Sequence, residues 1–276
     1  MKIAVTGASG FIGRHVAAIL TTSSDFETVT CSRFPSTTNP NSIQLDMADA
    51  DQDTFTRLGQ PDTLIHLAWD GLPNYDSSYH IDEEFPKQIK FLKQLINSGL
   101  KRLVVSGTCY EYGLQSGELT EESSIMPTTK YGQAKARLHE ALIQLEQEHQ
   151  FELVWLRLFY LYGTGQAKSS LYAQLQEAID LLKPQFDMSA GEQVRDFMPI
   201  EIAAERIVKI STLSGVAGTF NLCSGEPVKI KEIVGRWIAG SGTSIKMNLG
   251  YYPYPTSEPM EFWGCSDKLN SRIGNK

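Results

Sequence analysis

Over the first 160 residues, short apolar runs alternate with stretches whose apolar residues recur at the spacing of a helix. The first run is residues 3–5, and residues 16–20 follow with one apolar helix face. The same pattern predicts strands at 28–33, 43–47, 63–68, 103–106 and 153–158, and helices at 89–95 and 130–149. Strands and helices that alternate at this spacing predict a parallel sheet with helices on both faces.

Three glycines separate the first predicted strand from the first predicted helix. Gly7 permits a tight turn, Gly10 lets the backbone come close to a ligand, and Gly13 lets the helix pack closely on the strand. The free N–H groups at the start of the helix face the same place and would bind phosphate oxygens. A strand, a glycine turn and a helix in this order predict a dinucleotide site rather than a flexible loop.

The regular alternation ends after Gly163. Further helices are predicted at 171–182, 200–213 and 230–238, with a strand at 219–222 and a tail rich in Tyr, Pro and Gly. We therefore predict an α/β fold, namely a Rossmann-type doubly wound parallel sheet with a smaller C-terminal α+β lobe that binds substrate. The sheet domain is expected at 1–165 with about 198–222 returning to it, and the lobe at 166–197 and 223–276.

Composition narrows the class of protein. The 276 residues are 41% hydrophobic and 21% charged, as in an ordinary globular protein. The net charge of −7 argues against a nucleic-acid partner, and no apolar stretch is long enough to cross a membrane. The four cysteines are scattered without a CxxC pair, which predicts neither a metal site nor a disulfide framework. Without a signal-peptide pattern, a cytoplasmic protein with reduced thiols is expected.

A phenol and an ammonium group lie four residues apart at Tyr131 and Lys135, on one face of the predicted helix 130–149. Because a nearby cation favours the phenolate, we expect Lys135 to lower the pKa of Tyr131 from its reference value of about 10. Tyr131 could then exchange a proton with a carbonyl or alcohol oxygen. The pair follows a predicted strand that ends in Ser106-Gly107-Thr108.

Together these segments resemble the extended short-chain dehydrogenase/reductases, a family that acts on nucleotide sugars. The matching segments are the glycine motif at 6–13, residues 106–113, the pair at 131 and 135, the strand and turn at 157–163, and Arg195-Asp196-Phe197. The resemblance implies that Tyr131 donates a proton to the substrate oxygen and that Thr108 hydrogen-bonds the same oxygen. It also implies that Lys135 tunes Tyr131 and holds the nicotinamide ribose.

The resemblance further implies which residues bind ligands. For the cofactor they are Gly7, Ser9, Gly10, Phe11, Ile12, Gly13, Arg14, Ser32, Arg33, Asp46, Met47, Leu67, Ala68, Trp69, Ser106, Tyr131, Lys135, Leu158 and Tyr160. For the nucleotide-sugar substrate they are Thr108, Cys109, Tyr110, Tyr131, Tyr160 and Arg195, with Arg195 on the diphosphate. Members of the family often pair through two helices, so a homodimer through segments near 85–97 and 130–149 is expected.

Departures from the family pattern favour one reaction. Dehydratases of the family carry an acidic pair directly after the catalytic threonine, where this chain has Cys109 and Tyr110. The 4-epimerases usually end the second strand with an Asp that binds the ribose of a retained NAD, where this chain has Ser32 followed by Arg33. Unless Arg33 is only a solvated loop charge, it would bind a 2′-phosphate, with Arg14 as a second contact, so NADPH is expected rather than NAD.

The resemblance, with these departures, therefore implies an NADPH-dependent reductase of a nucleotide-linked 4-keto-6-deoxyhexose, with dTDP the expected nucleotide and surface glycans the expected destination. Hydride would reach C4 while Tyr131 donates the proton. A nucleotide-sugar 4-epimerase with retained NAD stays open as an alternative. A non-catalytic dinucleotide-binding redox regulator is a second one, against which the intact Tyr131 and Lys135 pair counts. His66, among apolar neighbours, is expected to be a core residue.

Overall fold

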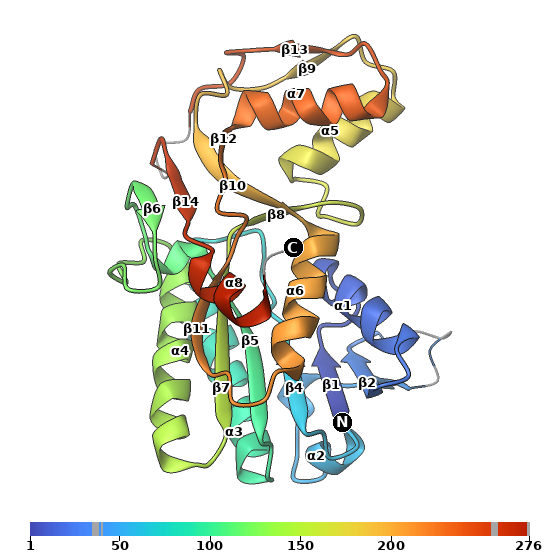
Figure 1. Cartoon of the computed structure of the whole chain (residues 1–276), viewed down its shortest axis with the longest axis vertical. Helices are drawn as coiled ribbons and strands as arrows, with labels where there is room; N and C mark the ends of the chain where they lie inside the picture. The colour runs from blue at the N-terminus through green and yellow to red at the C-terminus, as the bar shows by residue number, and fades with distance from the viewer. Residues whose placement is uncertain (35–38, 40, 255–258, 275–276) are drawn as a thin grey trace.

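The computed structural model describes residues 1–34, 39, 41–254 and 259–274 (Figure 1). At its centre lies a seven-stranded sheet in the order β11-β7-β5-β4-β1-β2-β3, in which each neighbouring pair is parallel. The strands are β1 (Lys2–Thr6), β2 (Glu27–Ser32), β3 (Ser42–Gln44), β4 (Thr63–His66), β5 (Arg102–Thr108), β7 (Glu152–Leu158) and β11 (Gly218–Leu222). The fold is thus the α/β, doubly wound parallel sheet that the hydrophobic pattern predicts.

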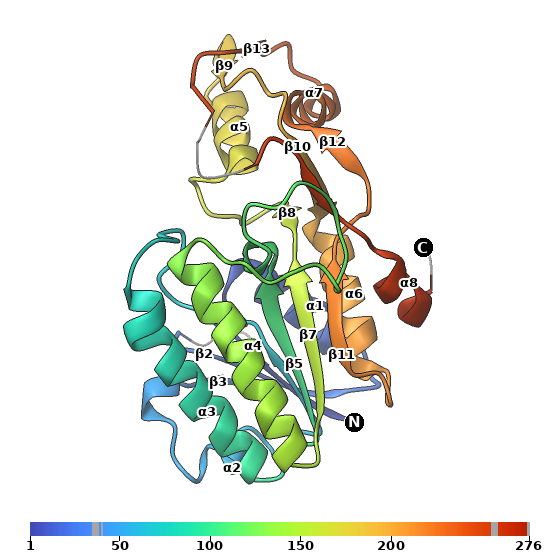
Figure 2. The same ribbon diagram turned by 90° about the vertical axis from the view of Figure 1, so that its left-hand side faces the viewer.

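Helices cover both faces of this sheet (Figures 1 and 2). On one face lie α1 (Phe11–Thr22), α6 (Ile200–Thr212) and α8 (Asp267–Ile273), and on the other α2 (Thr54–Arg57), α3 (Phe85–Asn97) and α4 (Lys130–Glu148). Because side chains alternate along a strand, Ile3 and Val5 pack with the first group while Ala4 packs with the second. Strands buried on both faces therefore appear in the sequence as unbroken apolar runs.

The segment 198–222 lies with the sheet although part of the lobe precedes it in the chain. β11 pairs with β7 along its whole length, from Gly218 opposite Val154 to Leu222 opposite Leu158. α6 packs against α1. The end of β7 is thereby held between β5 and β11.

The smaller lobe lies above the carboxyl ends of the sheet strands in Figure 1. Its helices are α5 (Leu171–Asp180) and α7 (Ile230–Ser241), and its core includes Leu175, Phe186 and Val234. Its strands, with those that join it to the sheet, are β6 (Gly117–Leu119), β8 (Tyr160–Tyr162), β9 (Gln185–Asp187), β10 (Val194–Pro199), β12 (Pro227–Lys229), β13 (Lys246–Asn248) and β14 (Phe262–Gly264). β10 pairs with β8 and β12, β9 with β13, and β6 with β14.

Several element boundaries differ from the predicted ones. The strand predicted at 43–47 ends at Gln44, because the Asp46 carboxylate accepts a hydrogen bond from the Ala48 N–H at 2.9 Å and begins the short helix η1 (Met47–Asp49). The helix predicted at 89–95 begins at Phe85 and is preceded by a turn of π-helix, η2 (His80–Glu84). Apart from β3, the three-residue strands were not predicted, and neither was α8, since these elements are too short to show a period. No helix in the described ranges combines the length and apolarity needed to span a membrane.

Candidate active site

Two adjoining cavities lie at the carboxyl ends of the parallel strands, where the strand order reverses between β1 and β4. The turn cavity, of about 180 Å³, is lined by Thr6, Gly7, Ser9, Gly10, Cys31, Ser32, Arg33, Leu45, Asp46, Met47, Leu67, Ala68, Trp69, Asp70 and Lys87. The tyrosine cavity, of about 370 Å³, is lined by Gly7, Gly10, Phe11, Ile12, Gly13, Leu67, Trp69, Leu72, Tyr75, Ser106, Gly107, Thr108, Cys109, Tyr110, Tyr131, Lys135, Leu158, Phe159, Tyr160, Leu161 and Gln166. The two walls share residues of the glycine turn, so the cavities meet there.

The predicted ligand residues lie along these walls with two exceptions. Every residue expected to bind the cofactor except Arg14, and every residue expected to bind substrate except Arg195, lines one of the two cavities. The structure thus brings together residues that are up to 153 positions apart, from Gly7 to Tyr160. Their individual roles stay predictions.

The glycine turn fits a dinucleotide diphosphate. Gly7 has φ +70°, and a Cβ added there would lie 2.7 Å from the Ala68 backbone nitrogen. A Cβ at Gly13 would overlap the Gly7 carbonyl oxygen. Gly10 caps α1 without a side chain, and the first turn of α1 holds no acidic residue that would compete for its N–H groups. Only glycine at these positions lets a phosphate approach the start of α1.

Thr108, Tyr131 and Lys135 come together in the tyrosine cavity from two elements. Tyr131 lies in the first turn of α4, which Thr129 caps by accepting from the Gly132 N–H at 3.1 Å. The Thr108 side chain lies at the end of β5 and lines the same cavity as the Tyr131 phenol. Lys135, one turn further along α4, donates from Nζ to the Ser106 carbonyl oxygen at 2.8 Å.

Burial governs the ionisation of this group. It raises the pKa of Tyr131 well above its ordinary value, with Tyr75 and Glu111 adding to the rise and the Thr108 hydrogen bond opposing it. It also lowers the pKa of Lys135 to about 7, against the attraction of Glu111 and Glu84. The expected lowering of the Tyr131 pKa by Lys135 is therefore wrong for this arrangement, because the cost of burying a phenolate outweighs the nearby cation.

Glu111 and Arg157 form a buried ion pair next to the end of β5. The Glu111 carboxylate accepts from the Thr108 backbone N–H at 2.9 Å, from Arg157 Nε at 2.8 Å and from Trp155 Nε1 at 3.0 Å. Arg157 also donates to the Tyr112 hydroxyl at 3.1 Å. Since Thr108 and Glu111 form a capping box around the short helix η3 (Cys109–Glu111), the position of the Thr108 side chain is fixed from both sides.

Trp69 lies where the two cavities meet and contacts both groups of residues. Its ring centroid is 4.0 Å from Lys135 Nζ, and its indole N–H donates to His80 Nδ1 at 3.1 Å. His80 in turn contacts the Asn74 carbonyl oxygen through Nε2 at 2.8 Å, which assigns the proton to Nε2. Trp69 is thus held over the ammonium group by the π turn.

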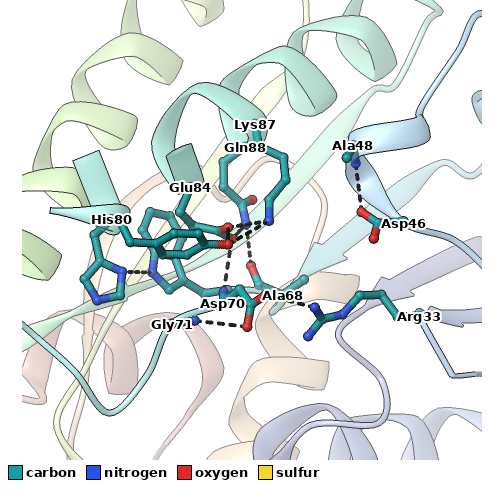
Figure 3. A network of polar contacts seen from close by, with 12 residues as sticks. Arg33, Asp46, Ala48, Ala68, Asp70, Gly71, His80, Glu84, Lys87 and Gln88 are labelled. Atoms are coloured by element: carbon teal, nitrogen blue, oxygen red, sulfur yellow. Dashed lines mark hydrogen bonds and ion pairs between the residues drawn. The ribbon is translucent and has the colours of Figure 1, made fainter. Parts of the chain in front are cut away.

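In the turn cavity, Arg33 forms an ion pair, although its side chain is also partly exposed to solvent. Its Nη1 lies 2.9 Å from the Asp70 Oδ2 atom, in the loop after β4 (Figure 3). The other arginine expected at a 2′-phosphate, Arg14, donates to the carbonyl oxygens of Ser9 and Gly10 at 3.2 Å each. Arg14 therefore braces the glycine turn. The expectation of NADPH assumed that the charge of Arg33 is available, and this pairing removes that assumption.

Arg195 lies away from both cavity walls. The side chain is buried, and it donates to the carbonyl oxygens of Val194 and Pro259 at 2.8 Å each. Its guanidinium carbon is 4.6 Å from the ring centroid of Phe262. These contacts tie β10 to the chain before β14. The expected role of Arg195 at the substrate diphosphate stays a prediction.

Sequence reasoning did not find several cavity residues. Among them are Asp70, Leu72 and Tyr75 between β4 and α3, Lys87 in α3, and Gln166 in the turn after β8. The others are Thr6, Cys31, Leu45, Gly107, Phe159 and Leu161. The Tyr75 ring stacks on Tyr110 with 4.9 Å between centroids. A cluster of aromatic residues directly after a buried strand, at 69–80, was the available signal. His66 is a core residue as expected, bonded to Thr6 at 2.7 Å and Gln88 at 2.5 Å.

Comparisons with known proteins show what this chain is similar to. Over 96% of this chain and 100% of the relative, it is 28% identical to a dTDP-6-deoxy-L-talose 4-dehydrogenase (NAD(+)) of Aggregatibacter actinomycetemcomitans. It is 26% identical to an uncharacterized UDP-glucose epimerase of Bacillus subtilis over 99% of this chain and 92% of the relative. A crystal structure of UDP-glucuronic acid 4-epimerase from Bacillus cereus, in complex with UDP-glucuronic acid and NAD, has the same fold, with a TM-score of 0.83 and 24% identity over 100% of this chain and 94% of that one.

A sequence model described as the NAD dependent epimerase/dehydratase family matches residues 3–223. The match runs from β1 through β11 and so includes the whole central sheet, the glycine turn and the Tyr131 and Lys135 pair. The chain belongs to the NAD-dependent epimerase/dehydratase family, whose members act on nucleotide sugars.

Proposed function

We propose that this chain is an oxidoreductase that interconverts a 4-keto and a 4-hydroxyl group on a nucleotide-linked 6-deoxyhexose, with reduction of the ketone as its working direction. The observation that carries the proposal is that Tyr131 and Thr108 line the same cavity, which adjoins the glycine turn. A single substrate oxygen can contact both hydroxyl groups there, next to the place where the turn would hold a dinucleotide.

The protein's part in the reaction follows from the ionisation of the site. A bound nicotinamide cofactor supplies the hydride that C4 receives. Because burial keeps Tyr131 protonated at neutral pH, its hydroxyl is ready to give its proton to the C4 oxygen, so that the ketone becomes an alcohol. Thr108 orients that oxygen. The Lys135 ammonium group, 5.9 Å from the centre of the Tyr131 ring, stabilises the phenolate that remains.

The sugar class rests on the relative and on the cavity wall. The relative that matches this chain over almost its full length is named for oxidation at C4 of a dTDP-linked 6-deoxyhexose. The stacked rings of Tyr75 and Tyr110, with Leu72 nearby, give the tyrosine cavity an apolar side. Such a side suits a sugar that carries a methyl group at C6 instead of a hydroxyl group. We therefore propose a dTDP-linked 4-keto-6-deoxyhexose as the substrate.

A nucleotide-sugar 4-epimerase is the second candidate. The likeness to a relative named as an epimerase extends over almost the whole chain, and the same three residues would serve both half-reactions. An epimerase would oxidise C4 and reduce it again from the other side, so it would retain its cofactor and consume none. The redox regulator needs no proton donor, and the Tyr131 and Thr108 arrangement gives it no support.

The test is to mix purified protein with dTDP-4-keto-6-deoxyglucose and to follow the loss of NADH or NADPH absorbance, beside the Tyr131→Phe variant. Oxidation that depends on Tyr131 is the expected result. Absence of oxidation with the dTDP-, CDP- and GDP-linked 4-keto sugars would overturn the reductase proposal. Inversion at C4 of a UDP-linked sugar, with NAD carried through purification, would then establish the epimerase. Absence of both activities would favour the regulator.

A further inference from the structure

The positively charged side chains in the wall of the turn cavity each form an ion pair with a carboxylate. Among the described residues that line this cavity, Arg33 and Lys87 carry positive charge, and each contacts a carboxylate (Figure 3). Arg33 Nη1 is 2.9 Å from Asp70, and Lys87 Nζ is 2.5 Å from Glu84. Asp46, a further acid in the wall, accepts from the Ala48 N–H. A ligand that carries extra negative charge therefore meets no unpaired cation in the described part of this wall.

Asp70 is held in place by contacts that do not involve Arg33. Its backbone N–H donates to Glu84 Oε1 at 3.0 Å, and its Oδ1 atom accepts from the Gly71 N–H at 3.0 Å. Glu84 is buried and also accepts from Gln88 at 2.6 Å. Burial alone would raise the pKa of Asp70, but the Gly71 N–H and Arg33 outweigh it and hold the pKa below its usual value. The carboxylate is thus both fixed and ionised at neutral pH.

A fixed carboxylate at this place discriminates between the two nicotinamide dinucleotides. The second strand ends at Ser32, and Ser32, Arg33 and Asp70 share one wall with the glycine turn, so this wall lies where the adenosine ribose would be bound. The ion pair is partly exposed, with 56% of the Arg33 side chain and 39% of the Asp70 side chain accessible, and contributes little by itself. A 2′-phosphate could displace Arg33 but would stay beside the anchored carboxylate. Ribose hydroxyl groups carry no charge and can donate to a carboxylate.

We infer that Asp70 determines coenzyme choice: its pairing with Arg33, together with its own fixed charge, makes the turn cavity select NAD(H) over NADP(H). The inference rests on the proposed function for the class of ligand, a nicotinamide dinucleotide. It replaces the expectation of NADPH, which was based on Ser32 and Arg33, with Arg14 as a second contact. Asp70 lies 37 residues beyond Arg33, in a different loop, and only the fold brings the two together.

Direct binding tests this inference without any sugar. The full chain, freed of nucleotide carried through purification, is titrated with NADH and with NADPH while the fluorescence of the reduced nicotinamide is followed. We expect the wild type to bind NADH more tightly, and Asp70→Asn to shift the affinity ratio toward NADPH by roughly tenfold or more, the size of effect that one additional charge-assisted hydrogen bond produces. A wild type that binds NADPH more tightly, or a ratio that Asp70→Asn leaves unchanged, would overturn the inference.

Two control variants distinguish the effect of the Arg33–Asp70 ion pair from the effect of removing any negative charge from this wall. Asp46→Asn removes the same charge from the same wall without releasing Arg33. The ratio of the NADH and NADPH affinities should therefore stay within about threefold of the wild-type ratio. A shift as large as that of Asp70→Asn would contradict the role of the pair. In Asp70→Asn/Arg33→Ala the preference shift toward NADPH should largely disappear, and a shift of full size would count against Arg33.

Arg33→Ala alone tests the inference even if Asp70→Asn does not fold. Because the charge of Arg33 is already neutralised, this variant should change the ratio by less than about threefold. A loss of roughly tenfold in NADPH affinity alone would overturn the inference. Since no sugar is present, a wrong sugar assignment leaves these results unchanged. A wrong coenzyme assignment, conversely, would leave Tyr131-dependent turnover of the sugar intact with NADPH.

Discussion

The turn cavity and the tyrosine cavity each contain a lysine, and the surroundings of the two lysines differ. Lys87 lies 2.5 Å from Glu84, and although burial lowers its pKa, the contact with Glu84 raises it above the usual value. Lys135 contacts a carbonyl oxygen and the face of Trp69 instead, and in the described ranges no carboxylate lies within ion-pair distance of it. In our proposals, the paired charges select the coenzyme, whereas the unpaired charge of Lys135 remains available for a negative charge formed during the reaction.

The largest effect should come from the proton donor. We expect Tyr131→Phe to lower kcat/KM by roughly 10²–10⁴-fold, the range for loss of a positioned acid, while NADH affinity stays within about threefold. This result would separate the chemistry of the tyrosine cavity from binding in the turn cavity. Steady-state kinetics and nucleotide titration measure the two quantities. Tyr75→Phe is the matched control, because it removes a hydroxyl from the same wall, and it should cost less than about tenfold.

The two lysines should respond in opposite directions to the same substitution. Lys135→Met removes a buried charge whose folded-state pKa is about 7, below the unfolded value of about 10.4. The unfolded chain binds the additional proton between these values, so the cost of the buried ammonium is fully present below pH 7 and fades as pH rises toward 10. Lys135→Met should therefore raise Tm by roughly 2–4 °C at pH 6.5 and by less at pH 9, while it abolishes turnover.

Lys87→Met should lower Tm instead, because it leaves the buried Glu84 carboxylate without its cation. Melting curves of both variants at the two pH values are the measurement. If both variants lowered Tm by the same amount at both pH values, the contrast between the two cavities would fail.

A smaller effect is expected at Trp69. Trp69→Leu removes the ring 4.0 Å from the Lys135 ammonium group, a contact that contributes up to about 2 kcal/mol when desolvated. The charged form of Lys135 is then less stable, so the alkaline limb of the pH profile of kcat/KM should move toward lower pH by up to about 1.5 units. Trp69→Phe, which keeps an aromatic face but loses the N–H bond to His80, should move the limb less. If the alkaline limb did not move in Trp69→Leu, the Trp69 ring would not stabilise the charged form of Lys135.

The sheet and most cavity residues could be predicted because they depend on local patterns. Buried parallel strands give apolar runs, Gly7 and Gly13 leave no room for a side chain, and helical spacing places Tyr131 and Lys135 on one face. The resemblance to a family then indicates which residues meet. The expected homodimer stays a prediction.

What could not be predicted depends on how loops fold and on burial. The sequence shows that Arg33 is a cation but not that Asp70 reaches it from another loop. It shows a lysine near Tyr131 but not that desolvation outweighs the effect of that lysine. Arg195 falls in a family motif, yet the backbone carbonyl groups that occupy it come from residues 64 and 65 positions away. The partners of Arg33 and Arg195 are thus distant in sequence, and the pKa of Tyr131 depends on burial.

The π turn at His80–Glu84 has a consequence for how such an enzyme can evolve. His80 at its start accepts a hydrogen bond from the Trp69 indole N–H. Glu84 at its end accepts one from the backbone N–H of Asp70, the residue that follows Trp69 in the chain. The segment His80–Glu84 thus positions both Trp69, which contacts Lys135, and Asp70, whose carboxylate we propose faces the coenzyme. A substitution in this segment that changes the environment of Lys135 is therefore expected to change coenzyme choice as well, and the reverse. A lineage that changes its coenzyme is therefore expected to do so first at Arg33 or Asp70, and to leave the turn that supports them intact.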